Sequence, residues 1–166
     1  MVLGPARWPP PTAPDYNRPV HVRSRTVVDA GVTAVHGAVR DLATYPSWLG
    51  IVHRASLAEG PDGETAWSVD VGARLGPARL VKRLRMVRVA DEPERLVRFE
   101  RREVDGKPHP PWLLEVVMAT AGAGATELTV DLHYGGRRWL PGLDRLVRDE
   151  ARRAGPRLAT ILTTQP

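Results

Sequence analysis

Three polar residues occur where the pattern of apolar residues predicts the inside of a fold: His53, Arg101 and Tyr134. A histidine in such a place can act as a general base that removes a proton next to a carbonyl. A buried phenol needs a hydrogen-bond partner and could orient a carbonyl or hydroxyl group of a ligand. These three residues are the candidate catalytic set, although a lone histidine on an apolar face is more often an ordinary core residue.

Arg101 shares the strand parity of Val97 and Phe99, which are apolar. An arginine that faces an apolar interior must pair with a carboxylate or meet an anionic ligand, because an isolated buried charge is costly. The expected partners are Glu103 on the same face of the strand, or Glu150 beside the apolar stripe of the last helix. Arg101 is therefore either part of a structural ion pair or a clamp for a substrate.

Apolar and aromatic side chains accompany this set on the same face of the expected strands. Pairing Trp112 with Tyr134 and Met118 with Leu128 in one antiparallel hairpin places the large apolar residues of both strands on one side. Such side chains either line a ligand cavity or form a packed core. The candidate ligand-binding residues are Trp67, Phe99, Trp112, Leu114, Met118 and Tyr134.

Alternation of polar and apolar residues predicts the strands that position these side chains. Residues 20–28 form a first strand, and six more strands lie between residues 51 and 136, separated by turns rich in Gly, Pro and Asp. Short connections between long strands indicate antiparallel hairpins. Between the first two strands, a helical period after Gly31 and the segment 45–48 predict two short helices.

A long helix is predicted after Pro141, with an apolar stripe from Leu143 to Leu162 and a kink at Gly155-Pro156. A sheet with one apolar face needs a cover, and this helix is the only long candidate. The expected fold class is α+β, with an antiparallel sheet of six to seven strands covered by the helix. We expect one domain over residues 20–166 and a Pro-rich flexible tail over residues 1–19.

The composition excludes several classes of function. The chain has no cysteine, and its five histidines lack the spacing of a metal-binding motif. It contains no Walker loop, nucleophile elbow or dinucleotide fingerprint. We therefore expect no cofactor and no metal. Because no apolar run is long enough for a membrane span or a signal peptide, we also expect a cytoplasmic protein.

A basic stretch from Arg79 to Arg88 alternates cationic and apolar residues in a chain with a net charge of +5. Leu80, Leu84 and Met86 are expected inside, with Lys82 as a further candidate for that face and with Arg83 and Arg85 in solvent. All but two of the 24 basic residues are arginines, and they are spread along the chain. The net charge by itself therefore does not identify a binding partner. The stretch is a solvated strand face, a docking face for an acidic carrier protein or anionic lipid, or a nucleic-acid site. The last interpretation lacks aromatic residues on the exposed face.

The segment DLATYPSW, residues 41–48, resembles the D-x-x-x-Y-P-x-W element of START-like (SRPBCC) proteins, in the polyketide cyclase/dehydrase and lipid-transport branch. The order of strands and the long last helix match the helix-grip fold of that superfamily over about residues 20–164. The segments VGARLGPARLVKRLRMVR and LHYGG-RRWLPGLDRLV are similar to an actinobacterial subgroup, most of whose members have no assigned activity.

This resemblance implies a curved sheet wrapped on the long helix, with a cavity between them for a small hydrophobic or aromatic ligand of lipid or polyketide type. Binding of such a ligand is the leading expectation. The alternative is an aromatic polyketide cyclase/dehydrase, in which Arg101, Tyr134 and His53 polarise and deprotonate a substrate delivered by an acidic acyl carrier protein. Nucleic-acid binding through residues 79–88 is a second alternative. No feature of the sequence indicates an oligomeric state.

Overall fold

The computed structural model describes residues 20–135 and 143–164, so the expected tail over residues 1–19 lies outside the described residues. The elements are β1 (Val20–Val28), α1 (Val32–Val39), η2 (Leu42–Ser47), β2 (Val52–Glu59), η3 (Pro61–Gly63), β3 (Thr65–Leu75), β4 (Ala78–Glu92), β5 (Leu96–Arg101), β6 (Trp112–Thr120), β7 (Thr126–Tyr134) and α2 (Leu143–Thr164). Apart from the short turn η3, this is the order that the sequence predicts.

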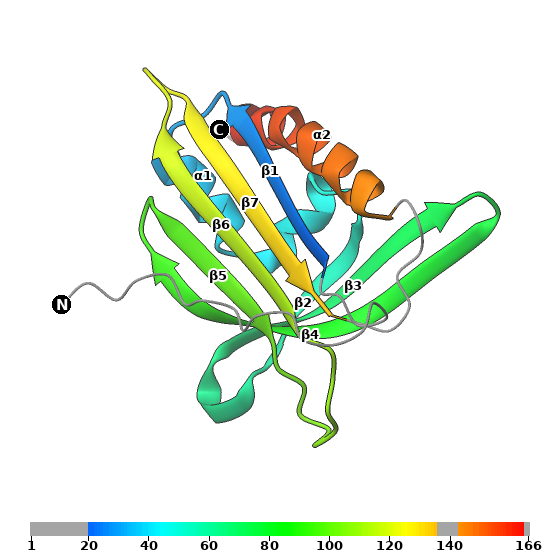
Figure 1. Ribbon diagram of the computed structural model, residues 1–166. Coiled ribbons are helices and arrows are strands. Elements are labelled where there is room, and N and C mark those ends of the chain that lie inside the picture. The colour runs from blue at the N-terminus through cyan, green and yellow to red at the C-terminus, as the bar shows by residue number, and fades with distance from the viewer. Residues whose placement is uncertain (1–19, 136–142, 165–166) are drawn as a thin grey trace.

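The seven strands found in the described residues form one antiparallel sheet in the order β1-β7-β6-β5-β4-β3-β2. The sheet curves around α2, which packs mainly against β1 (Figure 1). Buried residues of α1 and η2, together with Ala154 and Leu158 of α2, belong to one core cluster with residues of the strands. All three helices therefore cover the same, inner face of the sheet, which confirms the predicted α+β class.

The hairpin of β6 and β7 has the register that its sequence predicts. Trp112 pairs with Tyr134, and Met118 pairs with Leu128. Residues that pair directly in an antiparallel ladder share a face, so these side chains all point to the inner side. Val116, Met118 and Leu128 are at most 3% exposed. The apolar pattern alone was sufficient to fix this pairing, because a slip by one residue would expose the whole set.

The DLATYPSW motif builds η2 and docks it on β3. The carboxylate of Asp41 accepts hydrogen bonds from the backbone N–H of Ala43 and from the indole N–H of Trp67, both at 2.9 Å. Tyr45 is 1% exposed and donates its phenol proton to the Val39 carbonyl at 2.9 Å. Burial raises the pKa of Tyr45 far above its usual value, so the phenol stays neutral. The motif therefore has a structural role in this protein.

The helix α2 continues through Pro156 without interruption. It lies close to β1 at Gly155, where a Cβ atom would lie 2.4 Å from the hydroxyl oxygen of Thr26. Leu158 of the apolar stripe is fully buried in the core. Glycine at position 155 therefore permits the close packing of helix and strand. Neither α2 nor any other helix in the described part of the chain is long and apolar enough to cross a membrane.

Candidate functional site

The inner face of the sheet has a filled half and an accessible half. In the filled half, Trp67, Phe99 and Met118 are 1%, 0% and 3% exposed, and the rings of Trp67 and Phe99 meet edge to face at 5.6 Å. In the accessible half, inward-facing apolar residues are only partly buried: Val71, Trp112, Leu114 and Val130. Apolar side chains that point into a concave face and still reach solvent indicate room for a hydrophobic ligand.

Trp112 and Tyr134 form the aromatic wall of the accessible half. Their ring centroids are 5.0 Å apart, and the ring planes are inclined at 33°. Tyr134 is 3% exposed and belongs to an apolar cluster with Val22, Leu132 and Val147. The indole N–H of Trp112 is buried but has no hydrogen-bond partner in the described part of the chain. A buried donor without a hydrogen bond carries a free-energy penalty of about 1–3 kcal/mol. A hydrogen bond to an oxygen of a ligand or of a water molecule would remove this penalty.

Lys82 lies at the rim of this wall. Its ammonium nitrogen is 5.8 Å from the ring centroid of Trp112, within the range of a cation–π contact. Desolvation and the positive charge of Arg101 lower the pKa of Lys82, although the carboxylate of Glu103 acts in the opposite direction. The sequence offered Lys82 as a candidate for the inner face of its strand but did not indicate it as a site residue. Its contact joins β4 to β6 across β5, and no local pattern reveals such a contact.

Arg101 lies close enough to Lys82 for their charges to interact, but its guanidinium group is already paired. The side chain is 6% exposed, and its Nε atom donates to a Glu103 oxygen at 2.7 Å. The predicted partner Glu103 is thereby confirmed. The other expected partner, Glu150, instead accepts a hydrogen bond from Arg157 at 3.0 Å. These contacts favour the structural interpretation of Arg101 over a substrate clamp.

His53 lies on the edge strand β2, whereas Arg101 and Tyr134 lie on β5 and β7. The prediction that His53 belongs to the apolar face is wrong. The register of β2 and β3 shifts between Val52 and Arg54, and His53 is exposed. A β-bulge of this kind inserts one residue and breaks the alternation on which the prediction depends. The structure therefore does not bring the three candidate catalytic residues together.

An open pocket of about 350 Å³ adjoins His53 where β2 begins. Gly72 makes room for the imidazole, because a Cβ atom there would lie 2.8 Å from the His53 Cε1 atom. A guanidinium nitrogen of Arg79 lies 3.4 Å from His53 Nδ1. The lining residues are Gly50, Ile51, His53, Gly72, Arg74, Arg79, Leu146 and Glu150. This basic, mostly polar lining suits an anionic group better than a hydrophobic body.

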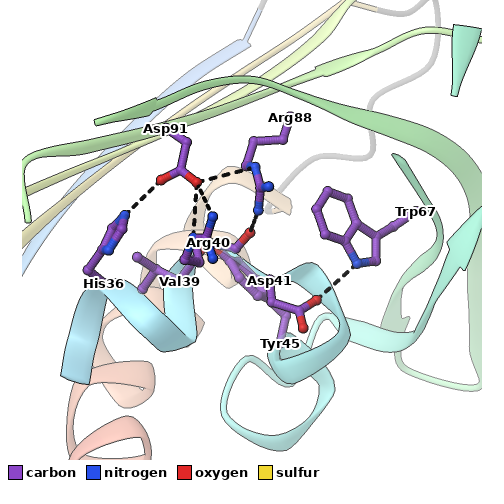
Figure 2. A network of polar contacts seen from close by, with 8 residues as sticks. All are labelled: His36, Val39, Arg40, Asp41, Tyr45, Trp67, Arg88 and Asp91. Atoms are coloured by element: carbon purple, nitrogen blue, oxygen red, sulfur yellow. Dashed lines mark hydrogen bonds and ion pairs between the residues drawn. The ribbon is translucent and has the colours of Figure 1, made fainter. Parts of the chain in front are cut away.

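A polar network around Asp91 anchors α1 to β4 (Figure 2). The Asp91 carboxylate accepts hydrogen bonds from His36 at 2.7 Å and from Arg40 at 2.6 Å, and it lies 3.5 Å from Arg88 Nε. Arg88 also donates to the Arg40 carbonyl at 2.7 Å. Each of these contacts joins two protein groups and brings the end of α1 onto the sheet, so the network is structural.

The described residues contain one group of potential metal ligands, His21, Asp131 and His133, whose ligand atoms all lie within 4.8 Å of one another. The pairing of β1 with β7 sets His21 opposite His133, which the spacing in the sequence could not reveal. Arg23, however, donates to both Asp131 oxygens, at 2.8 and 3.0 Å. Its charge would repel a cation, so the group fits an ion-pair cluster better than a metal site.

The basic stretch of β4 is partly neutralised by its neighbours. Leu84 and Met86 are 1% and 5% exposed, which confirms the face that the sequence predicts for them. Leu80, expected to be buried on the same face, is instead 45% exposed, because the ladder between β4 and β5 begins only at Met86. Arg83 donates to Asp70 on β3 at 2.7 Å, and Arg85 donates to a backbone carbonyl of β2. No aromatic residue occurs between positions 78 and 92. This strand therefore offers no platform on which nucleic-acid bases could stack.

Comparison with known proteins places the chain in a sequence family. A family model described as polyketide cyclase / dehydrase and lipid transport matches residues 19–162. No curated protein matches the chain significantly.

Solved structures share the fold at low sequence identity. A START superfamily protein from Mycobacterium smegmatis has a TM-score of 0.64 at 17% identity, over 88% of this chain and 99% of that one. The Zhui aromatase/cyclase from Streptomyces sp. R1128 has a TM-score of 0.53 at 15% identity, over 88% and 89%. The ginseng major latex-like protein 151 from Panax ginseng has a TM-score of 0.56 at 14% identity, over 80% and 91%. These likenesses establish the helix-grip fold.

Proposed function

We infer the function from one premise: the chain belongs to the polyketide cyclase/dehydrase and lipid transport family. We propose that it binds a small hydrophobic or aromatic ligand, of lipid or polyketide type, in the accessible half of the inner sheet face. Trp112, Leu114 and Tyr134 supply the apolar wall, and Lys82 supplies the polar rim. The observation that carries the proposal is the buried indole N–H of Trp112, which has no acceptor in the described part of the chain.

The site is best suited to a ligand that carries a carbonyl or hydroxyl oxygen on an aromatic or acyl body. The oxygen accepts a hydrogen bond from the Trp112 indole, and the body packs on the aromatic wall. A hydrogen bond of this kind contributes about 0.5–1.5 kcal/mol. A hydrocarbon of the same shape should therefore bind roughly twofold to twelvefold more weakly than the oxygenated ligand.

The test compares 2-acetylnaphthalene with 2-isopropylnaphthalene, which differ in the carbonyl oxygen but have similar shapes. Affinities are measured by displacement of the neutral fluorescent probe N-phenyl-1-naphthylamine. The wild-type protein should prefer the ketone, whereas Trp112→Phe, which keeps a ring but removes the donor, should bind both compounds equally.

Trp48→Phe is the matched control for this experiment. Trp48 is 3% exposed in the filled core, and its indole N–H already contacts the Thr44 hydroxyl at 3.3 Å. This variant should keep the preference for the ketone. Equal affinities for the two compounds in the wild-type protein, or loss of the preference in the control, would refute the assigned role of Trp112.

A second function, the cyclisation or dehydration of a carrier-bound aromatic polyketide, is favoured by Lys82. Its lowered pKa makes the amine a better proton-transfer group, and it lies beside the aromatic wall. An acidic acyl carrier protein would deliver the substrate. If Lys82→Met and Tyr134→Phe abolish the conversion of a carrier-bound poly-β-ketone but retain probe binding, the protein is an enzyme. If the wild-type protein does not convert this substrate, ligand binding is the only one of the two proposed functions that remains.

A further inference from the structure

The end of the β3–β4 hairpin projects beyond the rest of the sheet (Figure 1). The ladder between β2 and β3 ends at the pair Val52–Val71, and the ladder between β4 and β5 begins at Met86–Arg101. The backbone N–H of Gly72 still donates to the Ile51 carbonyl just before β2, at 2.8 Å. Residues 73–81 pair with one another and with no third strand of the described sheet. We call these residues the arm. From position 76 to position 81 every residue is exposed.

The arm carries two arginines that face each other. Arg74 and Arg79 are direct cross-strand partners, so their like charges share one face of the ribbon and repel. No acidic residue occurs between positions 71 and 84, and neither arginine has a carboxylate within ion-pair distance in the described residues. Two exposed guanidinium groups held side by side without a counter-charge form a receptor for an external anion.

The same two arginines line the pocket at the base of the arm, together with His53. The acidic residue of this pocket is Glu150, and its carboxylate is already occupied. It accepts hydrogen bonds from Arg157 at 3.0 Å and from Arg153 at 3.3 Å. The pocket therefore keeps a net positive character, and its volume of about 350 Å³ is ample for a phosphate group.

Two large apolar side chains lie beside these charges. Leu80 and Val81 are 45% and 52% exposed. As consecutive residues of a strand they point to opposite faces of the ribbon. A flat protein surface would cover only one of them, whereas the headgroup layer of a bilayer surrounds an inserted hairpin and covers both. Basic residues next to exposed apolar ones are typical of segments that lie in the interface of an anionic membrane.

We propose that the arm docks the protein on an anionic phospholipid surface. Leu80 and Val81 enter the headgroup layer, and Arg74, Arg79 and His53 bind the phosphate of a headgroup in the pocket. This interaction goes beyond the proposed ligand site, because it assigns the surface on which the protein meets a membrane. The side chains that it uses are other ones than Trp112, Leu114 and Tyr134 of the ligand site.

The test is co-sedimentation of the full chain with large vesicles. Vesicles of phosphatidylcholine alone are compared with vesicles that contain phosphatidylcholine and phosphatidylglycerol at roughly 7:3. The wild-type protein should bind the anionic vesicles and lose much of this binding at about 0.5 M NaCl, because salt screens exposed charges. Arg74→Glu combined with Arg79→Glu should weaken binding at least about tenfold.

The control variant for charge is Arg25→Glu combined with Arg152→Glu. Both arginines are 68% exposed outside the arm, so this variant has the same net charge as the arm variant. For the apolar contribution, Val81→Asp is compared with Val27→Asp, since both valines are 52% exposed. Only the arm variants should lose vesicle binding. The proposal would be overturned if each control variant lost as much vesicle binding as the arm variant with which it is compared. Equal binding of the wild-type protein to the two kinds of vesicle would also overturn it.

Two further outcomes would assign the arm to another partner. Arm-dependent binding to an acidic acyl carrier protein without binding to vesicles would make the arm a protein-docking element. Binding of inorganic phosphate alone, with no vesicle binding, would restrict the site to a free anion. The affinity of the same variants for 2-acetylnaphthalene is measured by displacement of N-phenyl-1-naphthylamine. The arm substitutions should change this affinity by no more than about twofold, which separates membrane docking from binding at the ligand site.

Discussion

Asp91 shows how one carboxylate can fix the position of a helix. Burial alone favours its neutral form, but the hydrogen bonds from Arg40 and His36 outweigh this effect, so the pKa of Asp91 lies below its usual value. A carboxyl group with a lowered folded-state pKa stabilises the protein at pH values above its unfolded-state pKa of about 4. That stabilisation is lost as the pH falls through the folded-state value.

Asp91→Asn should therefore lower the free energy of unfolding by about 1–2 kcal/mol at pH 7. The difference between variant and wild type should shrink as the pH is lowered below about 4, where the wild-type carboxylate is also neutralised. Urea denaturation at a series of pH values measures both effects. Asp62→Asn, at an exposed turn without an ion pair among the described residues, is the control. A difference for Asp91→Asn that is constant with pH would contradict this account.

At the scale of the elements, the contact between α2 and β1 depends on a single missing methyl group. Ala is a better helix former than Gly by about 1 kcal/mol, so propensity favours Gly155→Ala. The new Cβ atom, however, would lie 2.4 Å from the hydroxyl of Thr26, which forces the helix off the strand. Overpacking of this kind costs about 1–3 kcal/mol. We expect a net loss in the free energy of unfolding.

Gly37→Ala is the matched comparison. Gly37 also lies within a helix, α1, but a Cβ atom there would have no neighbour within 4 Å. Propensity should decide at this position, and the variant should gain about 0.5–1 kcal/mol. Opposite signs for the two substitutions in urea denaturation would confirm that Gly155 serves helix–strand packing. Stabilisation by both would show that the contact at Thr26 relaxes at little cost.

The elements also show which features a sequence can reveal. Alternation predicted the order of the elements along the chain. It also predicted the pairing of Trp112 with Tyr134, because one apolar face admits one register. It failed at His53, where the bulge adds a residue without any change in composition. It offered Lys82 as a candidate for the inner face but did not indicate its contact with Trp112, because this contact joins two strands that are not neighbours in the sheet. Local patterns thus predicted elements and faces, but not the irregular positions that shape the site.

At the scale of the whole molecule, the inner face divides into a part that supports the fold and a part that is open to a ligand. The rings of Trp67 and Phe99 fill the first part, whereas Trp112 and Leu114 in the second remain partly accessible. Among the six candidate ligand-binding residues, Trp67, Phe99 and Met118 belong to the packed core. Tyr134 is also almost fully buried, but it forms part of the aromatic wall. This division predicts where substitutions act on binding and where they act on stability.

Ligand binding to the native state alone must stabilise the whole molecule by mass action. A ligand at a hundred times its Kd adds about 2.7 kcal/mol, which for a domain of this size raises Tm by roughly 5–10 °C. We expect 2-acetylnaphthalene, at about a hundred times its Kd, to raise Tm by this amount in differential scanning fluorimetry. Leu114→Ala, in the accessible half, should reduce the shift. Met118→Leu conserves volume in the filled half, so it should leave the shift unchanged. Equal effects of the two variants would mean that the ligand enters the core instead, and the division of the inner face would then be wrong.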